Sequence, residues 1–293
     1  MPEQQRFIQE VSFALHHLFH WIHTNAREDV FQNIPTNIPR SWQEKLLAEK
    51  LYSIYAFDYR FIDHVTNAVE QQLTASIEQE LTIFRKSLQT TANLINVYSK
   101  NGQCAPVKPS REEGWFFSGS VDSESIPDES IKYRIYVNAK SERIAEFVQA
   151  LIEEQRRSLK GQGFKFKFAA YWNVDALDLM RPEKIVIYLP PETNYSLFLT
   201  FLSRKTNLFL DEAPMFAKQY CKGVAIAPHM VESLRDYLGV PSNSFGDAVC
   251  HIIARSLLSW IKRFGKLPQP EDFNQIGQAV YTIVMKQGYL GER

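Results

Sequence analysis

The residues of this sequence that could carry chemistry are mostly cations on short, strand-like segments. Lys165 and Lys167 alternate with Phe164, Phe166 and Phe168, so both lysines should share one face of a strand while the phenylalanines pack on the other. Burial lowers the pKa of an ammonium toward the range that a general base needs, so a half-buried Lys167 could act as a base. The alternative is an ordinary solvated strand face.

Two arginines could hold an anion such as phosphate. Arg134 lies in an alternating segment rich in aromatic and β-branched residues, and Arg181 precedes Pro182 at the entry to another such segment. The guanidinium is a planar fork of N–H donors that matches phosphate oxygens, so arginine suits an anion clamp better than lysine does. The alternatives are ion pairs, with a nearby acid for Arg134 and with Glu183 for Arg181.

A third candidate lies at the start of the last long predicted helix. Ser244 has the position of an N-cap, and Gly246 would let an anion approach the exposed backbone N–H groups, although Asp247 competes for the same positive end. His251 falls near the same helix face and could donate a proton. The alternatives are ordinary capping and, for His251, a buried imidazole with a hydrogen-bonded partner.

Hydrophobic periodicity indicates which elements would position these residues. Apolar residues recur at helical spacing in the first segment and again in several later ones, and they alternate or cluster in the strand-like ones. The predicted helices are 7–22, one starting at Ser41, 61–88, 141–159, 195–204 and 244–264, and the predicted strands are 132–137, 164–168, 185–189 and 223–227.

The chain divides in character near residue 105. Gly102, Pro106 and Pro109 interrupt helical spacing, and strand-like segments occur only after them. The sequence therefore predicts a helical N-terminal region, 1–105, followed by an α+β domain, 106–293, in which a mixed sheet is covered by helices.

Composition narrows the classes of function. The 33 basic residues balance the 33 acidic ones, which argues against nucleic acid as the main partner. The sequence has no apolar run long enough to span a membrane and no secretory signal, so we expect a cytoplasmic protein without membrane contact. The three cysteines are widely spaced and are expected to be reduced and structural. No common zinc, hydrolase or nucleotide-binding motif is present, so no cofactor is expected.

Two further groups have an ordinary and a functional interpretation. His16 and His20 could chelate a metal, but a plain helix surface is the alternative, and no metal is expected because no acid or cysteine accompanies them. Aromatic residues such as Trp115, Phe116 and Trp172 could line a peptide groove or belong to the core.

Short segments between residues 114 and 260 resemble, in order, the HopA-like family, known from type III secretion effectors and from lyases of lanthipeptide maturation. They are Gly114-Trp115-Phe116-Phe117, Tyr133-Arg134-Ile135-Tyr136-Val137-Asn138, Phe164-Lys165-Phe166-Lys167, Arg181-Pro182-Glu183, Val186-Ile187-Tyr188, Pro214-Met215-Phe216, Gly223-Val224-Ala225-Ile226-Ala227 and Ser244-Phe245-Gly246.

The resemblance implies an α+β fold and, among peptide-modifying members, removal of phosphate from phosphoserine or phosphothreonine to leave a dehydroamino acid, with a partner kinase supplying the phosphate. A lyase of this kind needs a base and a group that stabilises the departing phosphate. The corresponding candidates are Lys167 and His251 as catalytic residues and, as substrate-binding residues, Arg134, Arg181, Tyr136, Ser244 and Gly246.

The sequence also departs from the lyase type. Members of that type tend to carry an arginine shortly after the Ser-Phe-Gly step, where this chain has Ala248-Val249-Cys250, and the first hundred residues lack their glycine-rich strand pattern. The alternative function is therefore a non-catalytic effector or adaptor that binds a peptide or a partner protein.

Overall fold

The computed structural model describes residues 2–24, 40–57, 70–110, 114–191, 193–230, 232–240 and 244–286. The chain forms two compact units. The terminal unit combines Met1–Tyr59 with Met230–Arg293, and the central unit is Arg60–His229. The division at residue 105 stays a prediction about domain organisation.

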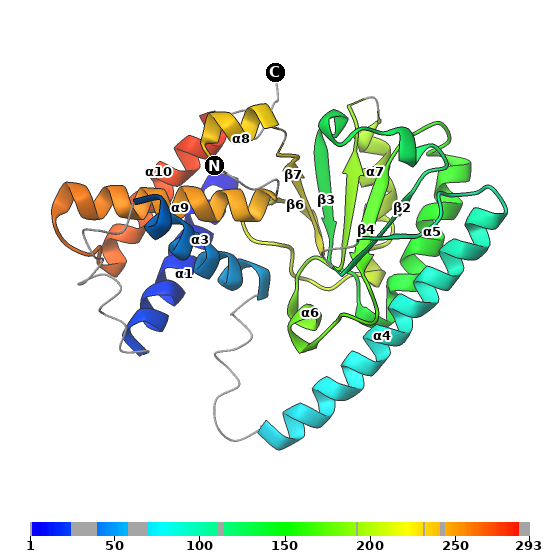
Figure 1. Cartoon of the computed structure of the whole chain (residues 1–293), viewed down its shortest axis with the longest axis horizontal. Helices are drawn as coiled ribbons and strands as arrows, with labels where there is room; N and C mark the ends of the chain where they lie inside the picture. Colours follow the sequence, from blue (N-terminus) through cyan, green and yellow to red (C-terminus); the bar gives the residue numbers. More distant parts are fainter. Residues whose placement is uncertain are drawn as a thin grey trace. The chain divides into compact units, whose positions relative to one another are not determined.

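The terminal unit is helical in its described residues (Figure 1). Its helices are α1 (Pro2–Thr24), α3 (Arg40–Phe57), α8 (Glu232–Leu238), α9 (Phe245–Phe264) and α10 (Phe273–Lys286). Helix α3 packs along α9, and α1 packs along α10. The predicted apolar stripe of α1 is buried at Phe7, Val11, Leu15 and Leu18, as its three- and four-residue spacing requires.

The central unit contains a seven-stranded sheet. The strands are β1 (Lys108–Pro109), β2 (Trp115–Gly119), β3 (Tyr133–Val137), β4 (Lys165–Ala169), β5 (Ile185–Leu189), β6 (Lys218–Cys221) and β7 (Val224–Pro228), in the spatial order β1-β2-β4-β5-β3-β7-β6. The unit's helices are α4 (Glu70–Lys100), α5 (Ile144–Arg157), α6 (Ala176–Met180) and α7 (Tyr195–Ser203).

The sheet corrects one expectation. Every described strand pair is antiparallel, whereas a mixed sheet was predicted. A helix between two strands, such as α5 between β3 and β4, suggests a parallel pair. β3 and β4 do run in the same direction, but β5 lies between them and pairs antiparallel with both. The α+β class itself is confirmed.

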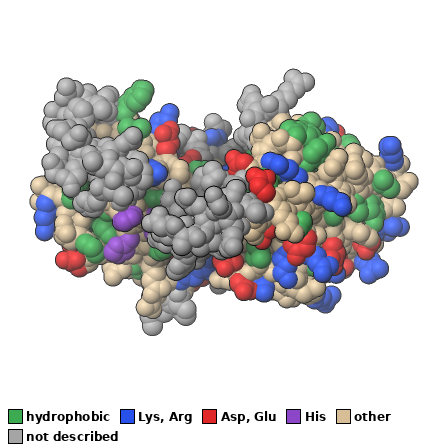
Figure 2. Space-filling view, turned by 90° about the horizontal axis from the view of Figure 1, so that it is seen from below, with side chains coloured by type: hydrophobic (Ala, Val, Ile, Leu, Met, Phe, Trp, Pro, Cys, Tyr) green, Lys and Arg blue, Asp and Glu red, His purple; other side chains and the backbone are tan. Residues whose placement is uncertain are grey.

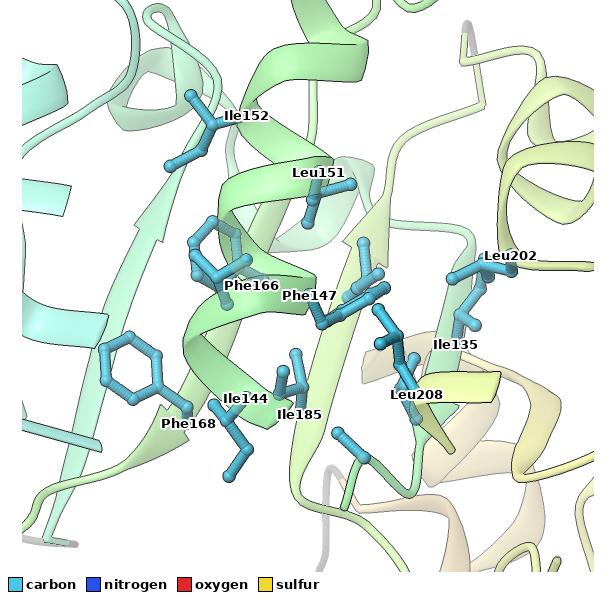
Figure 3. Close-up of a cluster of buried hydrophobic side chains, with 14 of the residues drawn as sticks. Ile135, Ile144, Phe147, Leu151, Ile152, Phe166, Phe168, Ile185, Leu202 and Leu208 are labelled. Atoms are coloured by element: carbon cyan, nitrogen blue, oxygen red, sulfur yellow. The ribbon is translucent and has the colours of Figure 1, made fainter. Parts of the chain in front are cut away.

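One face of the sheet forms the core of the central unit with α5 (Figure 3). Phe166 and Phe168 of β4 and Ile185 of β5 lie under Phe147 and Leu151 of α5, and all five side chains are fully buried. Burying one such side chain contributes roughly 1.5–3 kcal/mol, so this face fixes the register of the strands. The alternation predicted for Phe164 to Phe168 is therefore confirmed.

Each element predicted after residue 130 is observed near its predicted bounds, whereas α6, β6, α8 and α10 were not predicted. The predicted strand 185–189 coincides with β5, and the predicted helix 141–159 is observed as a 3-10 turn (Ser141–Arg143) followed by α5. Residues 61–69 of the predicted helix 61–88 lie outside the described residues, and α4 then extends to Lys100. Within the described part of the chain, no helix is long and apolar enough to cross a membrane.

Candidate functional site

The sheet's second face carries three of the seven predicted site residues, Lys167, Arg134 and Tyr136. The register places Lys167 opposite Val186, and Val186 opposite Tyr136; one row further, Lys165 faces Tyr188, which faces Arg134. Neighbouring strands lie about 4.8 Å apart, so each lysine is roughly 10 Å from its counterpart on β3. We call Trp115, Lys165, Lys167, Tyr188, Arg134 and Tyr136 the cationic face.

Trp115 brings two of the predicted cations together. The ammonium Nζ of Lys167 lies 4.3 Å from the centre of its ring, and the guanidinium carbon Cζ of Arg181 lies 5.3 Å from the same centre. Cations at such distances from an indole are attracted by its π electrons, by about 0.5–1 kcal/mol at exposed sites and more when water is excluded. Trp115 is half-buried, and it holds Lys167 and Arg181 at one place on the cationic face.

Arg181 also has an acidic neighbour. Its Nε lies 3.8 Å from Oδ1 of Asp178, within the turn that leads from α6 into β5, and both side chains are mostly buried. The ion pair expected for Arg181 was with Glu183, whereas the structure shows a pair with Asp178 of α6. Lys165, one row away from Lys167, donates to Oδ1 of Asp128 at 3.0 Å.

Arg134 is buried on β3, with 6% of its surface exposed. Its Nε donates to Nδ1 of His229 at 2.9 Å, and its guanidinium lies 5.1 Å from the centre of the Tyr188 ring. Because Nδ1 accepts this bond it carries no proton, so His229 is neutral in this arrangement with its hydrogen on Nε2. Burial lowers the pKa of Arg134, but Tyr136, Tyr188 and Glu183 raise it, and the net shift is upward.

Lys184 is a buried cation that sequence reasoning missed. Its Nζ donates to the carbonyl oxygens of Leu179 at 2.7 Å and of Arg181 at 2.5 Å, and burial lowers its pKa to about 8. In the preceding segment, Arg181-Pro182-Glu183, only Arg181 was considered as a site residue. The signal that could have identified Lys184 is its position directly before a fully apolar strand.

His251, Ser244 and Gly246 belong to the terminal unit. His251 is buried, with Nδ1 3.4 Å from Oε1 of Glu44 on α3. Arg255 binds the same carboxylate, with Nη2 2.8 Å from Oε1 and Nε 3.2 Å from Oε2. The alternative interpretation of His251, a buried imidazole with a hydrogen-bonded partner, describes this arrangement.

Burial raises the pKa of the Glu44 carboxyl, but hydrogen bonds and charge from Arg255, followed by those of His251, lower it, and the net shift is downward. Arg255 also donates to the backbone carbonyls of Leu238 and Gly239, at 2.6 and 2.8 Å. This cluster therefore ties α3 and the end of α8 to α9.

The start of α9 is close-packed. Ser244 precedes the helix with an extended backbone, and its carbonyl accepts a hydrogen bond from the N–H of Ala248 at 3.0 Å. A Cβ added at Gly246 would overlap the Tyr55 ring, so this glycine allows α3 and α9 to approach each other closely. Anion binding by Ser244 and Gly246 stays a prediction.

The aromatic residues and the pair His16 and His20 were the two further groups considered from the sequence. Phe116 is a core residue that contacts Phe168, whereas the side chain of Trp172 is 60% exposed. His16 and His20 are exposed on α1, and the ring of His16 packs edge-on against Phe273. Figure 2 shows blue and red side chains interspersed over the face that it views, which agrees with the balanced composition.

A comparison with protein families decides the relationship. The model described as the HopA1 effector protein family matches residues 108–270, which is more than half of the chain and includes the whole sheet. The chain belongs to the HopA1 effector protein family. The predicted resemblance is confirmed, and the matched residues include both the cationic face and the start of α9.

Two solved structures are also similar to this HopA1-family chain. The effector protein from Pseudomonas syringae pv. syringae strain 61 is 14% identical, with a TM-score of 0.46 over 82% of this chain and 90% of that one. The effector protein from P. syringae pv. tomato strain DC3000 is 9% identical, with a TM-score of 0.47 over 93% and 95%. Among curated proteins, no match was found.

Proposed function

We propose that this HopA1-family chain removes phosphate from a phosphoserine or phosphothreonine residue of a peptide or protein by elimination. The observation that supports this proposal best is the meeting of Lys167 and Arg181 at one ring, that of Trp115, on the sheet face that also carries Arg134. A base and an anion clamp would then lie side by side, as elimination requires.

The proposed reaction uses these side chains in separate roles. Lys167, as the free amine, takes the proton from Cα of the phosphorylated residue, and the electron pair of that C–H bond forms the Cα–Cβ double bond. The Cβ–O bond breaks, and phosphate leaves with the bonding electrons. Arg181 and Arg134 stabilise the phosphate, and Tyr136 contributes to binding, since Arg134 and Tyr136 belong to the cationic face and Arg181 lies against the Trp115 ring of that face.

The proposal assigns no step to His251, because its imidazole pairs with Glu44 within the terminal unit. Its predicted role as an acid stays open to the same assay. The substrate would be phosphorylated by a separate kinase, and both proteins would work in the cytoplasm. Nucleic acid, membrane and cofactor have no part in the scheme.

Mass spectrometry of a phosphothreonine peptide incubated with the protein, with and without a kinase, tests the activity. We expect loss of phosphoric acid from the peptide. Lys167→Met should slow the reaction by at least about 100-fold, as expected for loss of a general base, and Arg181→Met should weaken substrate binding.

Lys165→Met is the matched control, because Lys165 shares the strand and face of Lys167 but pairs with Asp128. Its effect should stay within a few-fold. An unchanged peptide mass in every condition would end the catalytic proposal.

The alternative is an effector or adaptor that binds a peptide or a host protein without chemistry. The engagement of Arg134 by His229 favours it, because the buried guanidinium already has a fixed partner, as does Ala248-Val249-Cys250 in place of the arginine of lyase-type members. A phosphopeptide that binds in calorimetry but keeps its mass would support this function.

A further inference from the structure

Lys184 connects three parts of the central unit by its backbone and side chain. Its backbone N–H donates to the carbonyl of Val137 on β3 at 3.0 Å. Its ammonium donates to the carbonyl of Leu179 in α6 and to that of Arg181, which follows α6 directly. Lys184 therefore links the end of α6 and the backbone of Arg181 to the start of β5 and the end of β3.

A buried ammonium at this place has a cost. Only 3% of the Lys184 surface is exposed, and its Nζ lies 5.9 Å from the centre of the core residue Phe84. A purely apolar side chain would avoid the loss of hydration that a charge suffers there. The ammonium nevertheless satisfies two carbonyls at the end of a short helix, where backbone acceptors lack partners of their own.

The charged residues around Lys184 include the candidate site residue Arg181. Asp178 and Glu183 in the same turn, together with Glu80 on α4, favour its charged form, whereas Arg181 disfavours it. Asp178 also lies 3.8 Å from Arg181, so the two cations share one acid.

We propose that Lys184 is a positioning residue, which holds the Arg181 backbone by its carbonyl and so keeps the Arg181 guanidinium against Trp115 beside Lys167. This role deepens the proposed function, on which it rests for the identity of the bound phosphate. The position of Arg181 over Trp115 can be measured without any substrate.

A double-mutant cycle on indole fluorescence tests the coupling. The contribution of Trp115 is the difference in emission between each protein and the same protein carrying Trp115→Phe. Arg181→Met should change this contribution, and Lys184→Met should change it in the same direction. The double variant should equal Arg181→Met alone, because Lys184 acts through Arg181. Additive changes, or no change in Lys184→Met, would overturn the inference.

A pH titration covers the case in which Lys184→Met fails to fold. In the unaltered protein, the Trp115 contribution should show a step near pH 8, where the ammonium loses its proton and its bond to the Arg181 carbonyl weakens. Arg181→Met, which keeps Lys167 beside the ring, should lose this step. Persistence of the step in Arg181→Met would assign it to another group and refute the coupling.

Substrate assays then separate this inference from the proposed function. With an active protein, Lys184→Met should lower kcat/KM for the phosphothreonine peptide by about tenfold, as Arg181→Met does. A protein that shows the fluorescence coupling but no elimination would retain the positioning role and lose the lyase. Elimination without coupling would have the opposite meaning.

Discussion

Two buried cations of the central unit have interaction partners that offset their loss of hydration. The guanidinium of Arg134 contacts the neutral imidazole of His229 and the ring of Tyr188. The ammonium of Lys184 donates hydrogen bonds to two backbone carbonyls. Both arrangements supply hydrogen bonds that replace water. Each cation is therefore held in one orientation, which is a condition for recognising an anion of fixed shape.

Partners close in sequence were easier to anticipate than distant ones. The alternation of Lys165 and Lys167 with phenylalanines predicted which side chains would share a face, because a strand has a period of two. Glu44 and His251 are separated by 207 positions, and His229 is 95 positions from Arg134, so local spacing holds no trace of either contact.

Glu44→Gln should destabilise the terminal unit. The substitution removes the charge that Arg255 and His251 share, and hydrogen bonds to a charged group contribute about 1.5–3 kcal/mol. Urea denaturation at pH 7 should show a lower free energy of unfolding. Glu49→Gln on the same helix is the control, because Glu49 and Lys45 are 3.9 Å apart and largely exposed.

The loss of stability caused by Glu44→Gln should depend on pH. Because the pKa of Glu44 is lowered in the folded protein, its carboxylate stabilises the fold fully above the ordinary value of 4.5, and this stability is lost as the pH falls through the lowered pKa. The difference between Glu44→Gln and the parent should therefore shrink in acid. A difference that grows below pH 4.5 would contradict the arrangement.

At the scale of elements, every segment predicted after residue 130 is observed, whereas several short segments and the 14-residue helix α10 were not predicted. The apolar run Ile185–Leu189 was predicted at its observed bounds. The two-residue strand Lys108–Pro109 and the partly exposed edge strand Lys218–Cys221 were not predicted, since neither has enough residues to show a period. The strand Trp115–Gly119 was recognised as aromatic but not as a strand.

Gly246→Ala tests the contact between α3 and α9. The added methyl group would overlap the Tyr55 ring, and overpacking of this kind costs about 1–3 kcal/mol. Thermal unfolding should occur at lower temperature. In a Tyr55→Ala background the same substitution should cost much less, because the obstructing ring is gone; an equal cost in both backgrounds would rule out this packing role.

At the scale of the whole molecule, the two units are predicted to unfold separately. Trp115 and Trp172 lie in the central unit, and Trp42 and Trp260 lie in the terminal unit. Variants that keep only one of these pairs should report urea transitions with different midpoints. Coincident transitions from the two variants would show that the units unfold as one.

This grouping could not be predicted from composition. The change in character near residue 105 separates helical from strand-containing segments, but it does not reveal that α1 packs against α10. Helical periodicity indicates that a face needs a partner without indicating which partner.

The packing of α1 against α10 also has a consequence during biosynthesis. The ribosome releases the apolar stripe of α1 long before α10 has been made, whereas every strand of the sheet is complete before then. The nascent chain therefore exposes the apolar surface of α1 that packs on α10 through most of its translation. Chains that end prematurely within α9 or α10 should therefore aggregate. We expect chaperones to bind the N-terminal segment as it emerges from the ribosome.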